Sequence, residues 1–128
     1  MNSLISSGIC ISVETFYQPD HSQPTENEFV FTYRITIENR NDFPVKLLRR
    51  HWMISDSNGE KREVEGEGVV GVQPLIMPGK YYQYVSACHL KSEIGRMSGE
   101  YLMQNIHTRL FFNCEIPEFL MQVPFKLN

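Results

Sequence analysis

Apolar and polar residues alternate with a period of two along much of this chain. In FVFTYRITIE, residues 29–38, every odd-numbered position is aromatic or aliphatic, and the even-numbered positions are polar except Val30. Successive side chains of a strand point to opposite faces, so this run predicts a strand with one face on a core. Ile9, Ile11 and Val13 follow the same alternation, which Tyr17 extends.

Other segments are rich in the residues that strands favour. Further strands are predicted at 80–87, 99–104, 109–116, 119–123 and around Trp52, where Leu48, Trp52 and Ile54 share a phase that Arg50 interrupts. Turn residues separate these runs at 18–27, 39–44, 56–60, 77–80 and 116–119. The Asn58-Gly59 pair predicts a hairpin with a type I′ turn. No window has the capped apolar stripe of a helix.

About seven short strands in 128 residues predict one domain, residues 1–128, folded as an all-β antiparallel β-sandwich. Three cysteines with no C-x-x-C spacing make a poor disulfide framework and indicate reduced thiols. The N-terminal segment lacks the features of a secretory signal, and no apolar run reaches the roughly 18 residues of a membrane span. We therefore expect a cytoplasmic protein without a membrane span.

The formal net charge of −3 argues against broad binding to nucleic acids or anionic membranes, so no nucleic acid partner is expected. Apolar residues make up 41% and charged residues 21% of the chain, which is ordinary for a globular protein.

Gly66, Gly68 and Gly71 have the G-x-G-x-x-G spacing of dinucleotide-binding turns. Those turns lie between a buried strand and a helix N-terminus. Here the preceding EKREVE is polar, and Pro74 and Pro78 prevent a helix afterwards. The chain is therefore not expected to contain a Rossmann site.

Two interpretations of the glycines stay open. Backbone amides can form an anion-binding concavity, with Lys61 and Arg62 neutralising the nearby glutamates. Alternatively, the glycines serve turns, bulges or close backbone approach, their more common use in β-proteins.

A family resemblance is carried by VEGEGVVGVQPLIMPGKYYQYVSACHL, which resembles the core signature of the ApaG domain. VKLLRRHWMISDSNGEKREV resembles that family's strand, Trp-bearing strand and hairpin, and GRMSGEYLM and FLMQVPFKLN resemble its last strands. The resemblance covers nearly the whole chain and implies a fibronectin type III or immunoglobulin-like β-sandwich.

The same resemblance implies a link to cobalt and magnesium tolerance or efflux, and an association with diadenosine tetraphosphate hydrolysis. It also implies partner binding, because the domain recurs in eukaryotic F-box proteins and in a polymerase-delta-interacting protein. In the family the glycine motif, here Gly66, Gly68 and Gly71, has been proposed as a pyrophosphate site.

Metal ligation and catalysis have weak sequence support. The four histidines, His21, His51, His89 and His107, form no cluster with ligand spacing, so no metal site and no cofactor are predicted. An acidic arm (Glu60, Glu63, Glu65 and Glu67) either attracts a hard cation or is a solvated face.

The cysteines do not predict a catalytic site either. Cys114 shares its phase with Leu110, Phe112 and Ile116, which predicts a buried thiol. Cys10 and Cys88 have no base at a recognisable spacing, and no catalytic signature appears, so the chain is not expected to be an enzyme.

A protein-binding surface is the remaining hypothesis. Arg49 and His51 share one strand face, and Tyr81 lies on the opposite face of its strand from Tyr82 and Tyr84. Tyrosine and arginine are enriched in interfaces. We therefore expect a non-catalytic cytosolic binding module that recognises an unknown protein partner through strand faces and the loop 66–79, with self-association into a homodimer as one use of the same patch. The alternatives are a pyrophosphate-containing or nucleotide ligand at the glycine loop, and direct divalent-metal binding.

Overall fold

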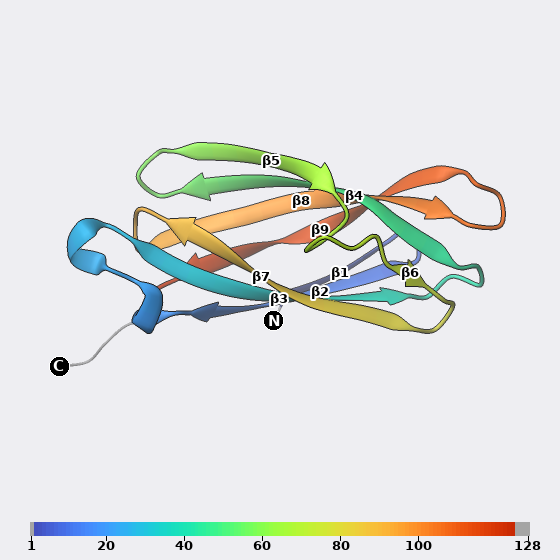
Figure 1. Ribbon diagram of the computed structural model, residues 1–128, viewed down its shortest axis with the longest axis horizontal. Helices are drawn as coiled ribbons and strands as arrows, with labels where there is room; N and C mark the ends of the chain where they lie inside the picture. The colour runs from blue at the N-terminus through green and yellow to red at the C-terminus, as the bar shows by residue number, and fades with distance from the viewer. Residues whose placement is uncertain (1, 125–128) are drawn as a thin grey trace.

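The computed structural model describes residues 2–124 (Figure 1). Nine strands make up most of it: β1 (Asn2–Ser6), β2 (Ile9–Tyr17), β3 (Phe29–Asn39), β4 (Val45–Asp56), β5 (Lys61–Glu67), β6 (Leu75–Ile76), β7 (Tyr81–Leu90), β8 (Ile94–Asn105) and β9 (Phe111–Gln122). The loop between β2 and β3 contains two single turns of 3₁₀ helix, η1 (Pro19–His21) and η2 (Pro24–Glu26). Residues 2–124 include no helix with the length and apolarity to cross a membrane.

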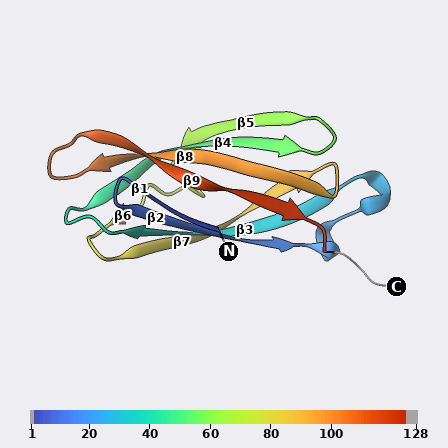
Figure 2. The same cartoon turned by 180° about the vertical axis from the view of Figure 1, so that it is seen from behind.

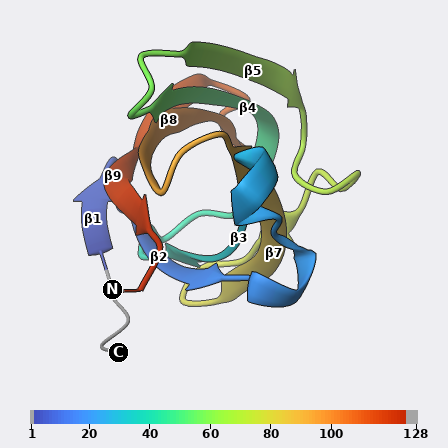
Figure 3. The same cartoon turned by 90° about the vertical axis from the view of Figure 1, so that its left-hand side faces the viewer.

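The strands form two antiparallel sheets that face each other (Figure 3). The first sheet has the order β1-β2-β3-β7, and the second has the order β5-β4-β8-β9, with β6 paired to the start of β4. The predicted all-β antiparallel sandwich is therefore confirmed. Its assignment to the fibronectin type III group stays a prediction.

The predicted alternation sets the core. The odd-numbered side chains from Phe29 to Ile37 are buried, as are Ile9, Ile11 and Val13. Trp52 lies at the centre, with its ring 5.6 Å from Tyr33, 5.9 Å from Phe119 and 6.3 Å from Tyr101. These edge-on contacts are favourable for aromatic rings and pack the two sheets together.

Two predictions, one of a core phase and one of a turn, were wrong at β-bulges, where an extra residue shifts the alternation. In β4 the register shifts between Leu47 and Arg49, so Leu47 is buried and Leu48, predicted to share the core phase of Trp52, is not. The segment 116–119 was predicted as a turn, but β9 runs through it. The extra residue lies at Pro117, where the register with β8 shifts, and a bulge is where a strand tolerates proline.

The β4–β5 hairpin is present, but its turn is not type I′. Gly59 has a φ of +95° and Asn58 has no positive φ. The amide of Asp56 donates to the carbonyl of Glu60 over 2.8 Å, and the amide of Gly59 donates to the carbonyl of Asp56 over 3.0 Å. This is a three-residue loop with glycine at the left-handed position.

One long side of the sandwich is closed by contacts between β1 and β9, which lie side by side (Figure 2). The Asn2 side-chain amide donates to the carbonyl of Glu118 over 2.7 Å, and the Glu115 amide donates to the Ser6 hydroxyl over 2.8 Å. On the other side the chain crosses between the sheets, from β5 to β7, and this crossing contains Gly68 and Gly71 of the glycine motif, whereas Gly66 lies in β5.

Candidate functional site

Residues 68–80, the crossing segment, leave β5 in the second sheet and enter β7 in the first. Val69 and Val72 exchange backbone hydrogen bonds of 2.7 and 3.0 Å, which makes a two-residue turn of Val70 and Gly71. This turn projects from the side of the sandwich (Figure 3). The segment then returns to β4, where the Leu47 amide donates to the carbonyl of Pro74 over 3.0 Å and β6 pairs with β4.

Each glycine of the motif has a structural reason. A Cβ on Gly66 would lie 2.7 Å from Nη1 of Arg50, and a Cβ on Gly68 would lie 2.3 Å from the carbonyl oxygen of Val72. Gly68 and Gly71 also have φ values of +63° and +76°, which glycine adopts without steric cost. The spacing is thus explained by a close approach and two turns.

The amides of this loop are largely committed within the protein. Those of Gly68, Val69 and Val72 donate to backbone carbonyls. Lys61 and Arg62 lie at the other end of β5, about 13–23 Å away along the strand. Arg62 reaches the first sheet instead, donating to the carbonyl of His89 over 2.6 Å. The structure therefore does not bring the predicted ligand-binding residues together.

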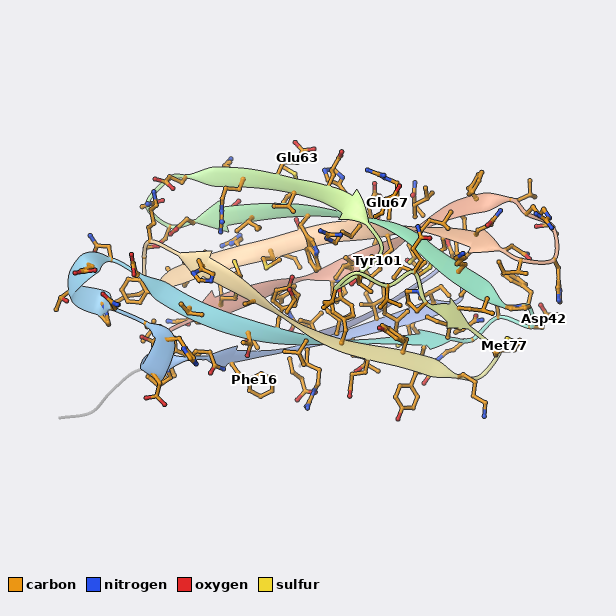
Figure 4. The ribbon with its side chains drawn as sticks, viewed as in Figure 1. Phe16, Asp42, Glu63, Glu67, Met77 and Tyr101 are labelled. Carbon is orange, nitrogen blue, oxygen red and sulfur yellow. The ribbon has the colours of Figure 1, made fainter. Side chains whose placement is uncertain are left out.

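The crossing segment displays apolar side chains to solvent. Val70 is 62% exposed, Val72 44%, Leu75 56% and Met77 49%, whereas Val69 and Ile76 are buried. Met77 is seen at the outer end of the sandwich (Figure 4). Val70 has a φ of +47°, a conformation that is strained for a β-branched residue. Strain of this kind often accompanies function.

The predicted tyrosine surface is only partly at the surface. Tyr81 is 67% exposed, but Tyr82 packs against the core and Tyr84 is buried. The Tyr84 hydroxyl shares a hydrogen bond with that of Tyr101 on the other sheet. Tyr84 is therefore not available to a partner and Tyr82 is only partly so, because that face of β7 points inward, and an interaction role for Tyr81 stays a prediction.

Arg49 and His51 lie together on the outer face of the second sheet, as predicted. Arg50 points the other way, and its Nη1 donates to the carbonyls of Glu67 and Gly68 over 3.0 and 3.1 Å. The Arg50 guanidinium is therefore hydrogen-bonded by backbone carbonyls at the end of β5.

His51 lies among carboxylates. Its Nε2 is 2.6 Å from Glu63 and 3.4 Å from Glu65, and its Nδ1 is 4.0 Å from Glu100. Glu63 and Glu67 project outward from β5 (Figure 4). One donor atom each of His51, Glu63 and Glu65 lies within 4.8 Å of the others, so these three groups could share a divalent cation. The sequence left a hard cation at the acidic arm as an alternative, but it did not place His51 beside Glu63 and Glu65.

All three cysteines are free and buried. Burial raises the pKa of the Cys88 thiol despite the nearby Arg62, and burial raises that of Cys114 to about 12. Thiols with raised pKa values are poor nucleophiles. Cys88 points inward while His89 is exposed, as their adjacent positions predicted.

Proteins of known family resemble this chain along most of its length. The ApaG domain profile matches residues 19–105. The chain is 44% identical over 119 residues to Protein ApaG of Escherichia coli O1:K1, covering 93% of this chain and 94% of that protein. Protein ApaG of Pectobacterium carotovorum is 42% identical over 116 residues, covering 91% of this chain and 92% of that one.

The chain belongs to the ApaG family.

Solved structures support the same assignment. A putative ApaA protein from Bordetella pertussis superposes with a TM-score of 0.88 at 37% identity, covering 92% of this chain and 95% of that one. The C-terminal domain of wzt superposes with a TM-score of 0.58 at 8% identity, covering 98% and 79%, and shares only the fold. In this chain the sandwich carries the crossing segment along one side and the His51 cluster on the outer face of the second sheet.

Two sets of surface residues were missed by sequence reasoning. The loop 66–79 was predicted to contact a partner, but its exposed apolar side chains were not named, because the run was analysed as a glycine motif. Glu100 and Glu115 join the face of His51 only through the pairing of β8 with β4 and β9. The alternation around buried Tyr101 could have placed Glu100 on an outer face, but not beside His51.

Proposed function

We propose that this ApaG family protein is a non-catalytic cytosolic binding module that recognises a protein partner through the crossing segment. The observation that carries this proposal is the outward row of apolar side chains on that segment, with Val70 at its tip. Exposed apolar groups gathered on one segment are typical of interaction sites. Burial of the Val70 side chain does not offset the backbone strain, since the side chain is mostly exposed.

The cysteines support the non-catalytic and cytosolic parts of the proposal. Buried thiols with raised pKa values are unsuited to attack a substrate. Unpaired thiols are also usual in a reducing compartment.

Photo-crosslinking tests the proposal in the cell that makes the protein. A photoreactive amino acid at position 70 is expected to give one discrete adduct, which Leu75→Asp and Met77→Asp abolish. The matched control is the same group at Val85, which is 53% exposed on the first sheet. No adduct from position 70, or the same adducts from both positions, would contradict the proposal.

A divalent-metal site is a second candidate, because His51, Glu63 and Glu65 place three donor atoms together. It would connect the protein to the cobalt and magnesium tolerance that the family resemblance implies. Paramagnetic Co²⁺ is expected to broaden NMR signals around His51, with the effect lost in His51→Asn and kept in His107→Asn. Broadening that is spread evenly over exposed carboxylates would argue against a site.

A pyrophosphate or nucleotide ligand at the glycine loop is the weaker alternative. Three of the loop amides, those of Gly68, Val69 and Val72, already donate to carbonyls, and the carboxylate of Glu67 lies next in the chain. An amide-shift titration with diadenosine tetraphosphate tests it, with saturable shifts at Gly68 and Gly71 as the result that would favour it.

A further inference from the structure

The outer face of the second sheet combines an acidic zone with an apolar zone, and we propose that it binds a protein segment in which basic residues adjoin apolar ones. This inference rests on the proposed function as a protein-binding module and names the chemistry of the partner.

The acidic zone is centred on one row across four strands. The register places Glu65, His51, Glu100 and Glu115 opposite one another in that order. Glu63 and Glu67 flank Glu65 on β5, so five carboxylates lie around a single histidine. Arg49 lies 4.0 Å from Glu67, and Arg96, further along β8, pairs with Glu118 over 3.3 Å.

The negative charge of this zone is incompletely balanced. Glu100 and Glu115 are direct cross-strand partners, and like charges in that position destabilise a sheet. Glu115 makes no ion pair among the described residues. A basic partner would relieve this repulsion, whereas a nucleic acid or an anionic membrane would add to it.

A shallow hollow of about 440 Å³ lies beside these two glutamates. Its other lining includes apolar groups from Leu4, Met53 and Pro117. Lysine and arginine bury an aliphatic stem while the charged head stays near polar groups. A hollow lined by both apolar groups and carboxylates, Glu118 among them, therefore suits a basic side chain of a partner.

The apolar zone lies on the same face, about 13 Å further along β8. Its row is Leu75, Lys46, Gln104 and Phe111, read across β6, β4, β8 and β9. Leu75 and Phe111 are 56% and 63% exposed, and the half-buried Leu102 lies between the two zones. The crossing segment contributes Leu75 to this zone, and its Gln73 side chain donates to the carbonyl of Leu48 over 3.0 Å.

Charge and apolar exposure together select the partner. A peptide with lysines alone would contact only the acidic zone, and a peptide with leucines alone would contact only the apolar zone. The complementary segment has both, separated by about four residues in an extended chain. A second copy of this protein would bring the same acidic zone to the interface, so it is the occupant to exclude.

Synthetic peptides test this inference by NMR titration of the labelled full chain. The probe has three leucines, a short serine spacer and three lysines, and the controls replace the leucines by serine or the lysines by glutamate. Saturable shifts on the outer faces of β4, β8 and β9 are expected for the probe alone. The double substitution Glu100→Gln, Glu115→Gln should weaken binding about tenfold, which corresponds to about 1.4 kcal/mol for the two charges together.

Matched variants separate the site from general charge. Glu26→Gln with Glu28→Gln removes the same charge at a distant loop and should leave binding unchanged. Phe111→Ser should weaken binding, and Phe16→Ser, on the first sheet, should not. The inference would be overturned if the serine-lysine control bound as tightly as the probe, or if the shifts appeared on the first sheet. It would also be overturned if the two glutamine pairs weakened binding equally.

Two further outcomes are decisive. Sedimentation that shows a dimer lost in Phe111→Ser would assign the face to a second copy and overturn the basic partner. The crosslink from position 70 reports on the proposed function separately. An adduct there with no peptide binding would refute only this inference, and peptide binding with no adduct would refute the recognition role of the turn at Val70.

Discussion

The hydroxyl of Tyr84 on β7 shares a hydrogen bond with the hydroxyl of Tyr101 on β8, so a polar contact joins the two sheets through the apolar core. Tyr101 is fully buried and Tyr84 nearly so. Burial raises the pKa of both phenols, which keeps both protonated, and one donates while the other accepts. Tyr101 lies between the sheets in Figure 4.

Removing one hydroxyl of this pair should lower the unfolding free energy by more than the net contribution of the hydrogen bond, because the other hydroxyl stays buried without a partner. Tyr84→Phe and Tyr101→Phe each leave a buried hydroxyl without its partner, which costs about 1–3 kcal/mol of unfolding free energy. The double variant loses both groups and should be less destabilised than the sum of the single variants. Urea denaturation of all four proteins measures this coupling, and strict additivity would show that the two hydroxyls do not depend on each other.

The glycine motif should respond to substitution as a structural element. Gly68→Ala places a Cβ 2.3 Å from the Val72 carbonyl at a φ of +63°, so it should cost more than about 2 kcal/mol. Gly71→Ala meets no atom within 4 Å and should cost only the left-handed strain, about 1 kcal/mol. Chemical denaturation gives both values.

A ligand site would behave differently from a structural loop. Pyrophosphate should leave the Tm of the parent protein unchanged, because a ligand raises Tm only when it binds the native state. If pyrophosphate raised the Tm of the parent protein but not that of Gly71→Ala, the glycine motif would be a binding site.

The sequence predicted the sheets but not the register of the hairpin that builds the acidic face. A two-residue turn at Asn58-Gly59 would pair Trp52 with Glu65 and place Glu63, Glu65 and Glu67 on the core side. The three-residue loop shifts the pairing by one position, so Glu65 lies opposite His51. A shift of one residue reverses every side chain of a strand, and dipeptide preference does not fix loop length.

The other misses have the same origin. A bulge at Leu48 changes which residues of β4 are buried. The sequence near Leu48 contains no residue type from which this bulge could be predicted. The inward direction of Tyr82 and Tyr84 depends on which face of β7 meets the other sheet. Alternation assigns the tyrosines of β7 to two faces, and both faces contain tyrosine. Only the packing of the sheets determines which of these faces is buried.

Asp56 should stabilise the fold at neutral pH and lose that effect in acid. Burial disfavours its charge, but the Ser92 hydroxyl and the backbone amides of Lys91 and Asn58 donate to the carboxylate, and the net result is a pKa below the ordinary 3.8. Because the folded pKa is lower than the unfolded one, the stabilisation is present above about pH 4 and lost as pH falls through the folded pKa.

Asp56→Asn tests this linkage. The variant should be less stable than the parent at pH 7, and the difference should shrink towards pH 2–3, as measured by urea denaturation at each pH. Asp20→Asn, in η1, lacks these contacts and serves as the control. A difference that stays constant over this range would mean that the charge of Asp56 does not contribute.

Val70 allows the stability and the binding role of the crossing segment to be separated. At a φ of +47° an L-residue is strained by roughly 1–2 kcal/mol, and asparagine tolerates this conformation better than valine. Val70→Asn should therefore raise the unfolding free energy by about 1 kcal/mol and the Tm by about 3–5 °C. The loss of apolar contact is small, because the side chain is mostly exposed.

The same substitution should weaken partner binding, because it removes the apolar tip of the crossing segment. Thermal unfolding gives the stability, and recovery of the adduct from a photoreactive group at Met77 gives the binding. Higher stability with lower binding would mean that valine is kept at this position for recognition at a cost to the fold. Lower stability would show that the turn depends on Val70 for packing, and the argument from strain would then fail.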